Sequence, residues 1–203
     1  PRNRGQRFGE INHLCAILAG DGRWGAEAYA ACAINPPPGY PFSMSPIERV
    51  ERALCDLGLE ARIVTFDRST ATAEEAAAAV GCQLGQIVKT LLFLADGRPT
   101  VVLVAGDRQV DTTKLARIAG VGRKRLKMGT PGQVRELTGF DVGGVAPVGM
   151  PARYDTIVDE SLQRFDEVWA AAGGHTAVFG VPTGALVEAV HGQWAAITKD
   201  DAS

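Results

Sequence analysis

A lysine inside an apolar stretch is the residue of this chain best placed to do chemistry. Residues 86–94 read QIVKTLLFL, and Lys89 puts an ammonium where a buried strand would carry apolar side chains. Successive strand residues point to opposite faces, so Lys89 shares a face with Ile87, Leu91 and Phe93. Neither face is polar throughout, which predicts a strand covered on both sides. Such a lysine reaches the surface, pairs with an anion or lines a wet cleft, because unpaired burial costs several kcal/mol. The stretch alone leaves a surface lysine and a functional cleft lysine both open.

A glycine-rich loop is the second unusual feature. Residues 140–150 read FDVGGVAPVGM, with Gly143 and Gly144 adjacent and Pro147 close behind them, so this stretch is neither regular helix nor strand. Glycines let the backbone approach a ligand closely and aim N–H groups at an anion or an oxyanion. An ordinary turn is the alternative interpretation.

Conventional acid–base catalysts are few. Of the three histidines, His175 lies in AAGGHTAVF, where it could reach a cleft, but a structural or surface role is favoured over catalysis because no partner is identifiable from the sequence. The chain has no P-loop, HExxH, nucleophile elbow or dinucleotide fingerprint. Chemistry here would therefore use lysine, backbone amides and water.

One short basic run is suited to a phosphate backbone. GRKRLK carries Arg123, Lys124, Arg125 and Lys127, and a solvated surface is the alternative interpretation. The whole chain has a net charge of −2, so RNA contact needs such a local patch.

The composition indicates one cytoplasmic domain. The 203 residues are 46% hydrophobic, which is enough for one core. The four cysteines have no metal-type spacing and are expected to be reduced thiols. No apolar run is long enough to span a bilayer, and we expect neither a membrane nor a DNA partner.

The elements that position these residues alternate along the chain. Capping boxes predict helices that begin at Ser45, Thr72 and Thr130, and Asp111 predicts a fourth helix start. Asp96-Gly97 predicts a hairpin between QIVKTLLFLA and PTVVLVAG. ARIVTF, DTIVD, EVWAAA and TAVFG read as further strands, and PTGALVEAVHG as a last helix. This order predicts an α/β fold of the α+β type: a mixed, barrel-like sheet surrounded by helices in one domain.

Residues 1–43 differ from the rest, with a polar start and the proline cluster INPPPGYPFS. Met44 directly precedes the first strong helix cap. We therefore expect residues 1–43 to be an N-terminal extension, disordered or not native, and residues 44–203 to form the domain.

Taken together, GQIVKTLLF, VAGDRQVDTTKLARIAG and RELTGFDVGGVAPVG resemble the YbaK/prolyl-tRNA-synthetase-associated editing domains in order and spacing, from about Met44 to about Val190. The resemblance implies a free-standing aminoacyl-tRNA deacylase without a metal or organic cofactor. Its implied substrate is proline tRNA mischarged with cysteine, alanine or another small amino acid, and prolyl-tRNA synthetase is an implied partner.

The resemblance also implies roles for single residues. Lys89 would hold the terminal phosphate or ribose of the acceptor end, and amides near Gly143 and Gly144 would hold the aminoacyl carbonyl. A ribose hydroxyl of the substrate would position the attacking water. The remaining substrate contacts that the resemblance implies are Phe66, Thr70, Thr72, Val145, Ala146 and Pro147. We also expect contacts from Thr90 and from His175, which has no counterpart in the family pattern. A non-catalytic module that binds tRNA or a synthetase is the alternative function, and a small-molecule hydrolase is a third.

Overall fold

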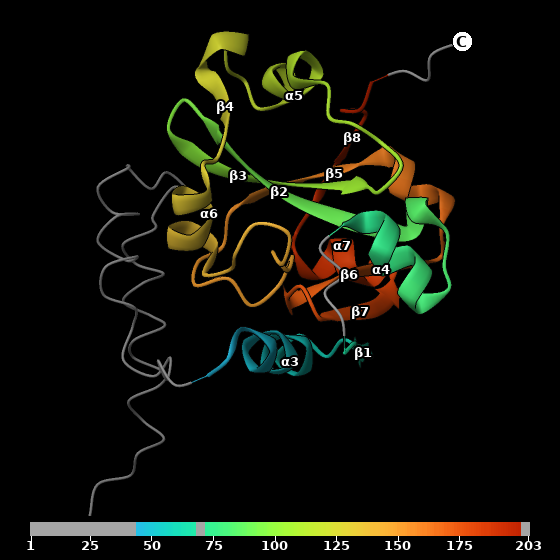
Figure 1. Cartoon of the computed structure of the whole chain (residues 1–203). Helices are drawn as coiled ribbons and strands as arrows, with labels where there is room; N and C mark the ends of the chain where they lie inside the picture. The colour runs from blue at the N-terminus through green and yellow to red at the C-terminus, as the bar shows by residue number, and fades with distance from the viewer. Residues whose placement is uncertain (1–43, 68–71, 200–203) are drawn as a thin grey trace, which may run out of the picture. The chain divides into compact units, whose positions relative to one another are not determined.

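The structure is a computed structural model, and it describes residues 44–67 and 72–199. Its helices and strands follow the predicted order (Figure 1). They are α3 (Pro46–Asp56), β1 (Arg62–Thr65), α4 (Ala73–Val80), η1 (Leu84–Gln86), β2 (Ile87–Ala95), β3 (Arg98–Ala105), α5 (Thr112–Ile118), η2 (Arg123–Arg125), β4 (Leu126–Met128), α6 (Pro131–Thr138), β5 (Asp155–Asp159), η3 (Glu160–Arg164), β6 (Glu167–Gly174), β7 (Ala177–Pro182), α7 (Thr183–Ala189) and β8 (Gln193–Ala195).

The predicted helix starts are confirmed by their caps. Ser45, Thr72 and Thr130 each form a capping box, in which the hydroxyl accepts from a backbone N–H three residues on. Asp111 caps α5 through the N–H groups of Thr113 and Lys114. Because each cap depends on residues three positions apart, it could be read directly from the sequence.

The strands form one mixed sheet, as predicted. Its order is β1-β7-β6-β2-β3-β5-β8, and β4 also pairs with β2. Antiparallel pairs join β1 to β7, β6 to β7 and β2 to β3, whereas β2–β6, β3–β5 and β5–β8 are parallel. The β2–β3 turn has positive φ at both Asp96 (54°) and Gly97 (83°), which is the geometry that Asp-Gly favours. β4 and β8 were not predicted, because three residues are too few to show a period.

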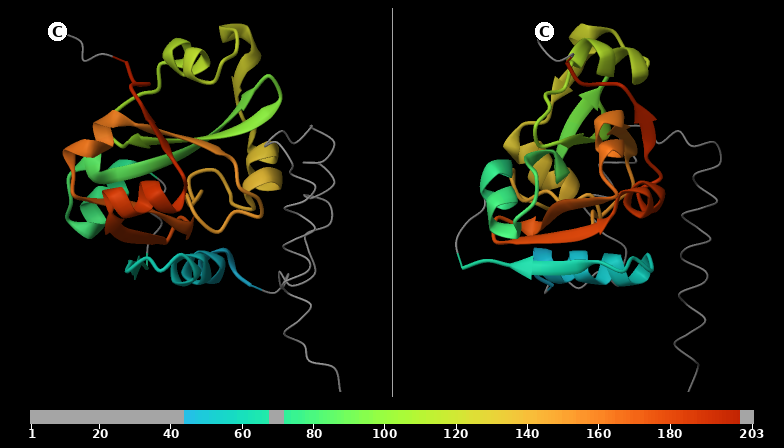
Figure 2. Two further views of the ribbon diagram at one scale, coloured as in Figure 1. Left: turned by 180° about the vertical axis from the view of Figure 1, so that it is seen from behind. Right: turned by 90° about the vertical axis from the view of Figure 1, so that its right-hand side faces the viewer.

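Core residues cover both faces of β2. Val88 and Leu92 belong to the larger apolar cluster, whereas Phe93 packs on the other face with Leu115 of α5. Figures 1 and 2 show α5 and β4 at one end of the domain and α3 and β1 at the opposite end. The central strand is therefore enclosed, as its apolar sequence predicted, and Lys89 lies on the Phe93 face.

We predict that a chain beginning at Met44 keeps this fold, because the first cap is formed by Ser45 and its partner Glu48. Its thermal unfolding midpoint should match that of the full chain. A chain beginning at Arg62 is the control: it loses α3 with the buried Val50 and Leu54 and should lose about 4 kcal/mol or more of stability. A Met44 chain that is insoluble or unfolded would contradict this prediction. The expected extension, residues 1–43, lies outside the described residues.

Candidate active site

A cleft opens where two strands leave the same edge of β2. β6 pairs with β2 only at Ile87 and Val88, and β4 pairs only from Phe93 to Ala95. The strand pairing therefore leaves residues 89–92 without a partner strand on this edge. The cleft there has a volume of about 290 Å³. Its lining includes five of the residues predicted to form the site: Thr72, Lys89, Thr90, Gly143 and Val145.

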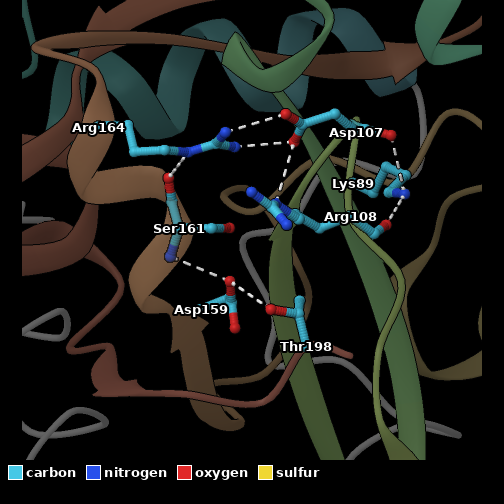
Figure 3. Close-up of polar contacts among 8 residues, drawn as sticks. Lys89, Asp107, Arg108, Asp159, Ser161, Arg164 and Thr198 are labelled. Carbon is cyan, nitrogen blue, oxygen red and sulfur yellow. Dashed lines mark hydrogen bonds and ion pairs between the residues drawn. The ribbon is translucent and has the colours of Figure 1, made fainter. Parts of the chain in front are cut away.

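Lys89 is a half-buried cleft residue, not a surface one. Its Nζ donates to the carbonyl of Gly106 at 3.1 Å and to the carbonyl of Arg108 at 2.5 Å (Figure 3). An ammonium has three N–H donors, so one donor remains without a partner among the described residues. Lys89 is also the only ionisable side chain in the described lining of the cleft. The arrangement presents one oriented positive charge to a bound anion.

An ion pair holds the turn that supplies these carbonyls. Arg164 of η3 donates from both terminal nitrogens to the Asp107 carboxylate, at 3.0 and 2.8 Å, and its Nε donates to the carbonyl of Ser161 (Figure 3). Bidentate pairs of this kind fix geometry as well as charge. The same contact lowers the pKa of Asp107. Asp107 therefore stays ionised between the two residues whose carbonyls hold Lys89.

η3 is fastened in turn to the last described segment of the chain. The buried Asp159 carboxylate accepts from the N–H groups of Ser161 and Ile197, both at 3.0 Å, and from the Thr198 hydroxyl at 3.3 Å. Figure 3 shows this second group of contacts below the Asp107–Arg164 pair. Sequence reasoning did not identify Asp107 or Arg164 as site residues, because 57 positions separate them and no local signal connects them.

The glycine loop faces the same cleft. Gly143 has a φ of +89°, which favours glycine. A Cβ on Gly144 would lie 2.8 Å from the Cα of Gly174, so only glycine fits between the loop and β6. The Gly144 N–H donates to the Asp141 carbonyl at 2.9 Å. The N–H groups of Gly143 and Val145 have no acceptor among the described residues, so these two amides can serve a ligand.

The other predicted contacts divide between the cleft and its surroundings. The Oγ1 atom of Thr90 is buried without a hydrogen-bond partner, and Thr72 forms the α4 cap. Phe66 packs beside Ile87 and Trp169 in a neighbouring apolar cluster. Thr70 lies outside the described residues.

Three further predicted residues do not line the cleft. Ala146 is fully buried, and Pro147 lines a second cavity of about 240 Å³. His175, in the turn between β6 and β7, is absent from the cleft lining. The hydrogen bond from Arg135 is the main cause of the lowered pKa of Asp141, and the electrostatic effect of His175 adds to it. His175 therefore lies within electrostatic range of Asp141, at the start of the loop.

The basic run leads directly to the cleft. Arg123, Lys124 and Arg125 form η2, and Lys127 lies in β4 next to Met128, which lines the cleft. Arg125 pairs with Asp96 at 2.9 Å. The other three cations are exposed and have no ion-pair partner within the described segments, so their charge is available to a polyanion.

Burial lowers the pKa of Lys89, and the negative charges of Glu74 and Asp107 partly oppose this shift. The folded protein therefore loses the Lys89 proton at a lower pH than the unfolded chain does. Between the folded-state pKa and the higher unfolded-state pKa, the unfolded chain binds more protons, so the contribution of Lys89 to the free energy of unfolding rises with pH.

We predict that Glu74→Gln lowers the Lys89 titration midpoint further, because it removes one negative charge that attracts the proton. NMR titration of the Lys89 side chain measures this midpoint, and Asp96→Asn is the control expected to leave it unchanged. A midpoint that stays constant or rises in Glu74→Gln would refute this electrostatic account.

Comparison with known proteins shows the family to which this chain belongs. A family model for the aminoacyl-tRNA editing domain matches residues 67–189. The uncharacterized protein YwhH of Bacillus subtilis is 32% identical over 140 residues, which cover 68% of this chain and 87% of that protein. The protein named "Putative Cys-tRNA(Pro)/Cys-tRNA(Cys) deacylase EbsC" of Enterococcus faecalis is 29% identical, over 64% of this chain and 79% of its own length.

A solved structure shares the fold. It is described as a "putative trans-editing enzyme for prolyl tRNA synthetase", is 39% identical and superposes with a TM-score of 0.73. The match covers 78% of this chain and all of that chain. None of the helices in residues 44–67 and 72–199 is long and apolar enough to cross a membrane. The chain belongs to the aminoacyl-tRNA editing domain family and is a hydrolase of ester bonds, of the aminoacyl-tRNA deacylase class.

Proposed function

We propose that this chain is a free-standing trans-editing deacylase that hydrolyses proline tRNA mischarged with cysteine or alanine. The observation that carries the proposal is the position of Lys89, the one charged group in the described cleft lining, in the same cleft as the free amides of Gly143 and Val145. The names of the EbsC and trans-editing relatives support proline tRNA as the carrier. The proposed location is the cytoplasm, with prolyl-tRNA synthetase as a partner.

Lys89 would bind the terminal phosphate or ribose of the acceptor end. Two of its N–H donors are engaged with carbonyls, so the third would donate to the substrate as a charge-assisted hydrogen bond. The exposed cations Arg123, Lys124 and Lys127 would bind phosphates farther along the RNA.

The loop amides would act on the ester itself. Water, positioned by a ribose hydroxyl of the substrate, attacks the ester carbonyl carbon, and the carbonyl oxygen gains negative charge that the Gly143 and Val145 N–H groups stabilise. The bond to the ribose oxygen then breaks, which releases the amino acid and the tRNA with a free hydroxyl. An aminoacyl ester is already reactive, so orientation and oxyanion stabilisation supply the rate gain.

The cleft lining favours a small amino acid. Beside the Thr90 hydroxyl, its walls carry the aliphatic side chains of Val88, Leu92, Val134 and Val178. A short side chain such as that of alanine or cysteine would fill this space, and a larger one would meet buried core residues.

We predict that Lys89→Ala lowers kcat/KM by roughly 100-fold, because a charge-assisted contact with the substrate is lost. The assay is deacylation of proline tRNA charged with cysteine, alanine, serine or proline, at protein concentrations far below that of the tRNA. Lys199→Ala, at an exposed lysine bonded to Gln109, is the control. Unchanged deacylation by Lys89→Ala would refute the mechanism. Stoichiometric protection of charged tRNA without turnover would instead favour a non-catalytic binding module.

We predict that Gly144→Ala lowers kcat by roughly 100-fold with little change in KM, because the added Cβ displaces the loop from β6 and misplaces the oxyanion donors. Gly132→Ala in α6 is the matched control, since a Cβ there meets no neighbour within 4 Å. Steady-state kinetics on the preferred charged tRNA separates kcat from KM. A wild-type kcat in Gly144→Ala would exclude the loop amides from the reaction.

A further inference from the structure

The two most exposed large hydrophobic side chains in the described chain lie at the rim of the cleft. Met128 is 60% exposed and Val142 is 55% exposed, and both line the cleft. Single exposed apolar residues are ordinary. Two exposed apolar side chains that line the same cleft are instead a candidate contact surface for a ligand.

The two side chains come from different walls of the cleft. Met128 ends β4, whereas Val142 follows α6 and immediately precedes Gly143. The buried Leu92 and Val134 also line the cleft. Exposed and buried apolar side chains therefore both contribute to its lining.

Met128 lies on the same face of the sheet as Lys89. It is the antiparallel partner of Phe93, and side chains of partners project to one face. Phe93 is four residues from Lys89, or roughly 13 Å along the strand. One nucleotide bridges such a span when long, flexible side chains reach toward it from both ends.

The surrounding charge indicates a nucleic acid as the occupant. Lys127 directly precedes Met128, and Arg123 and Lys124 lie just upstream, all exposed and without ion-pair partners in the described part of the chain. Met128 therefore lies between the exposed cations and Lys89. A single-stranded RNA end has the corresponding chemistry, with phosphates along its backbone and an unstacked base at its terminus.

We propose that Met128 and Val142 form a platform for the terminal nucleobase of the RNA 3′ end, an inference that rests on the proposed deacylase function. The base face packs on the flexible, polarisable Met128 side chain from one wall and on Val142 from the other. This contact places the ribose between the platform and Lys89, with the ester at the Gly143 amide. Because every base has an apolar face, the platform selects for an unpaired end and not for a sequence.

The test uses two aminoacylated RNA hairpins that differ only in the 3′-terminal nucleotide, which carries either adenine or no base. Met128→Ala should lower kcat/KM on the adenine hairpin roughly tenfold, and Val142→Ala should act in the same direction. Wild-type protein should have a lower kcat/KM on the base-free hairpin than on the adenine hairpin. On the base-free hairpin, both variants should have the same kcat/KM as wild type. Met128→Leu, which keeps an apolar side chain of similar volume, should retain wild-type rates.

Ile118→Ala is the matched control, because Ile118 is exposed (41%) on α5 and does not line the cleft. Equal losses on both hairpins, or no loss on the adenine hairpin, would overturn the platform while leaving the deacylase function intact. Wild-type protein that hydrolyses neither hairpin nor charged tRNA would overturn the proposed function itself. Thermal unfolding of each variant, expected to match wild type, shows that any loss comes from the contact and not from the fold.

Discussion

The ammonium of Lys89 keeps its place in a half-buried cleft because two main-chain carbonyls, at Gly106 and Arg108, accept from it. Burial lowers its pKa, and the charges of Glu74 and Asp107 oppose that effect. A cation moved out of water is costly unless dipoles and counter-charges replace the lost hydration. These contacts do so while leaving one donor for a ligand. The rest of the site is arranged around this charge.

The turn that carries those carbonyls is not held by its own sequence. Asp107 is fixed by Arg164, and η3, which carries Arg164, is fixed by the buried Asp159 and the segment around Ile197. The turn at Asp107, η3 and the segment around Ile197 are thus linked by hydrogen bonds that orient the Lys89 side chain. Such a chain of hydrogen bonds favours a single, pre-organised position of the charge, which is what electrostatic stabilisation of a reacting ester requires.

The cleft itself is a consequence of sheet topology. β6 runs parallel to β2 and β4 runs antiparallel to it, and both use the same edge over short, separate stretches. Where they diverge, the middle of β2 has no neighbour, and the glycine loop closes one side of the gap through the contact of Gly144 with Gly174. The topology of the mixed sheet therefore creates a cleft beside its central strand β2, whose two faces pack against different core clusters.

The sequence by itself determined the helices, the main strands and the hairpin at Asp96-Gly97. It also indicated Lys89 and the glycine loop as candidates for chemistry. Capping, turn formation and alternation depend on residues a few positions apart, so they are visible in one dimension. Only the tertiary structure decided that Lys89 faces a cleft and not bulk water, that Gly143 lies in that cleft whereas Pro147 lines another, and that Asp96 neutralises Arg125. It also brought Asp107 to Arg164 and placed β4 beside the cleft. Those outcomes depend on contacts between residues tens of positions apart, and the free energy that selects among them comes from packing the whole sheet.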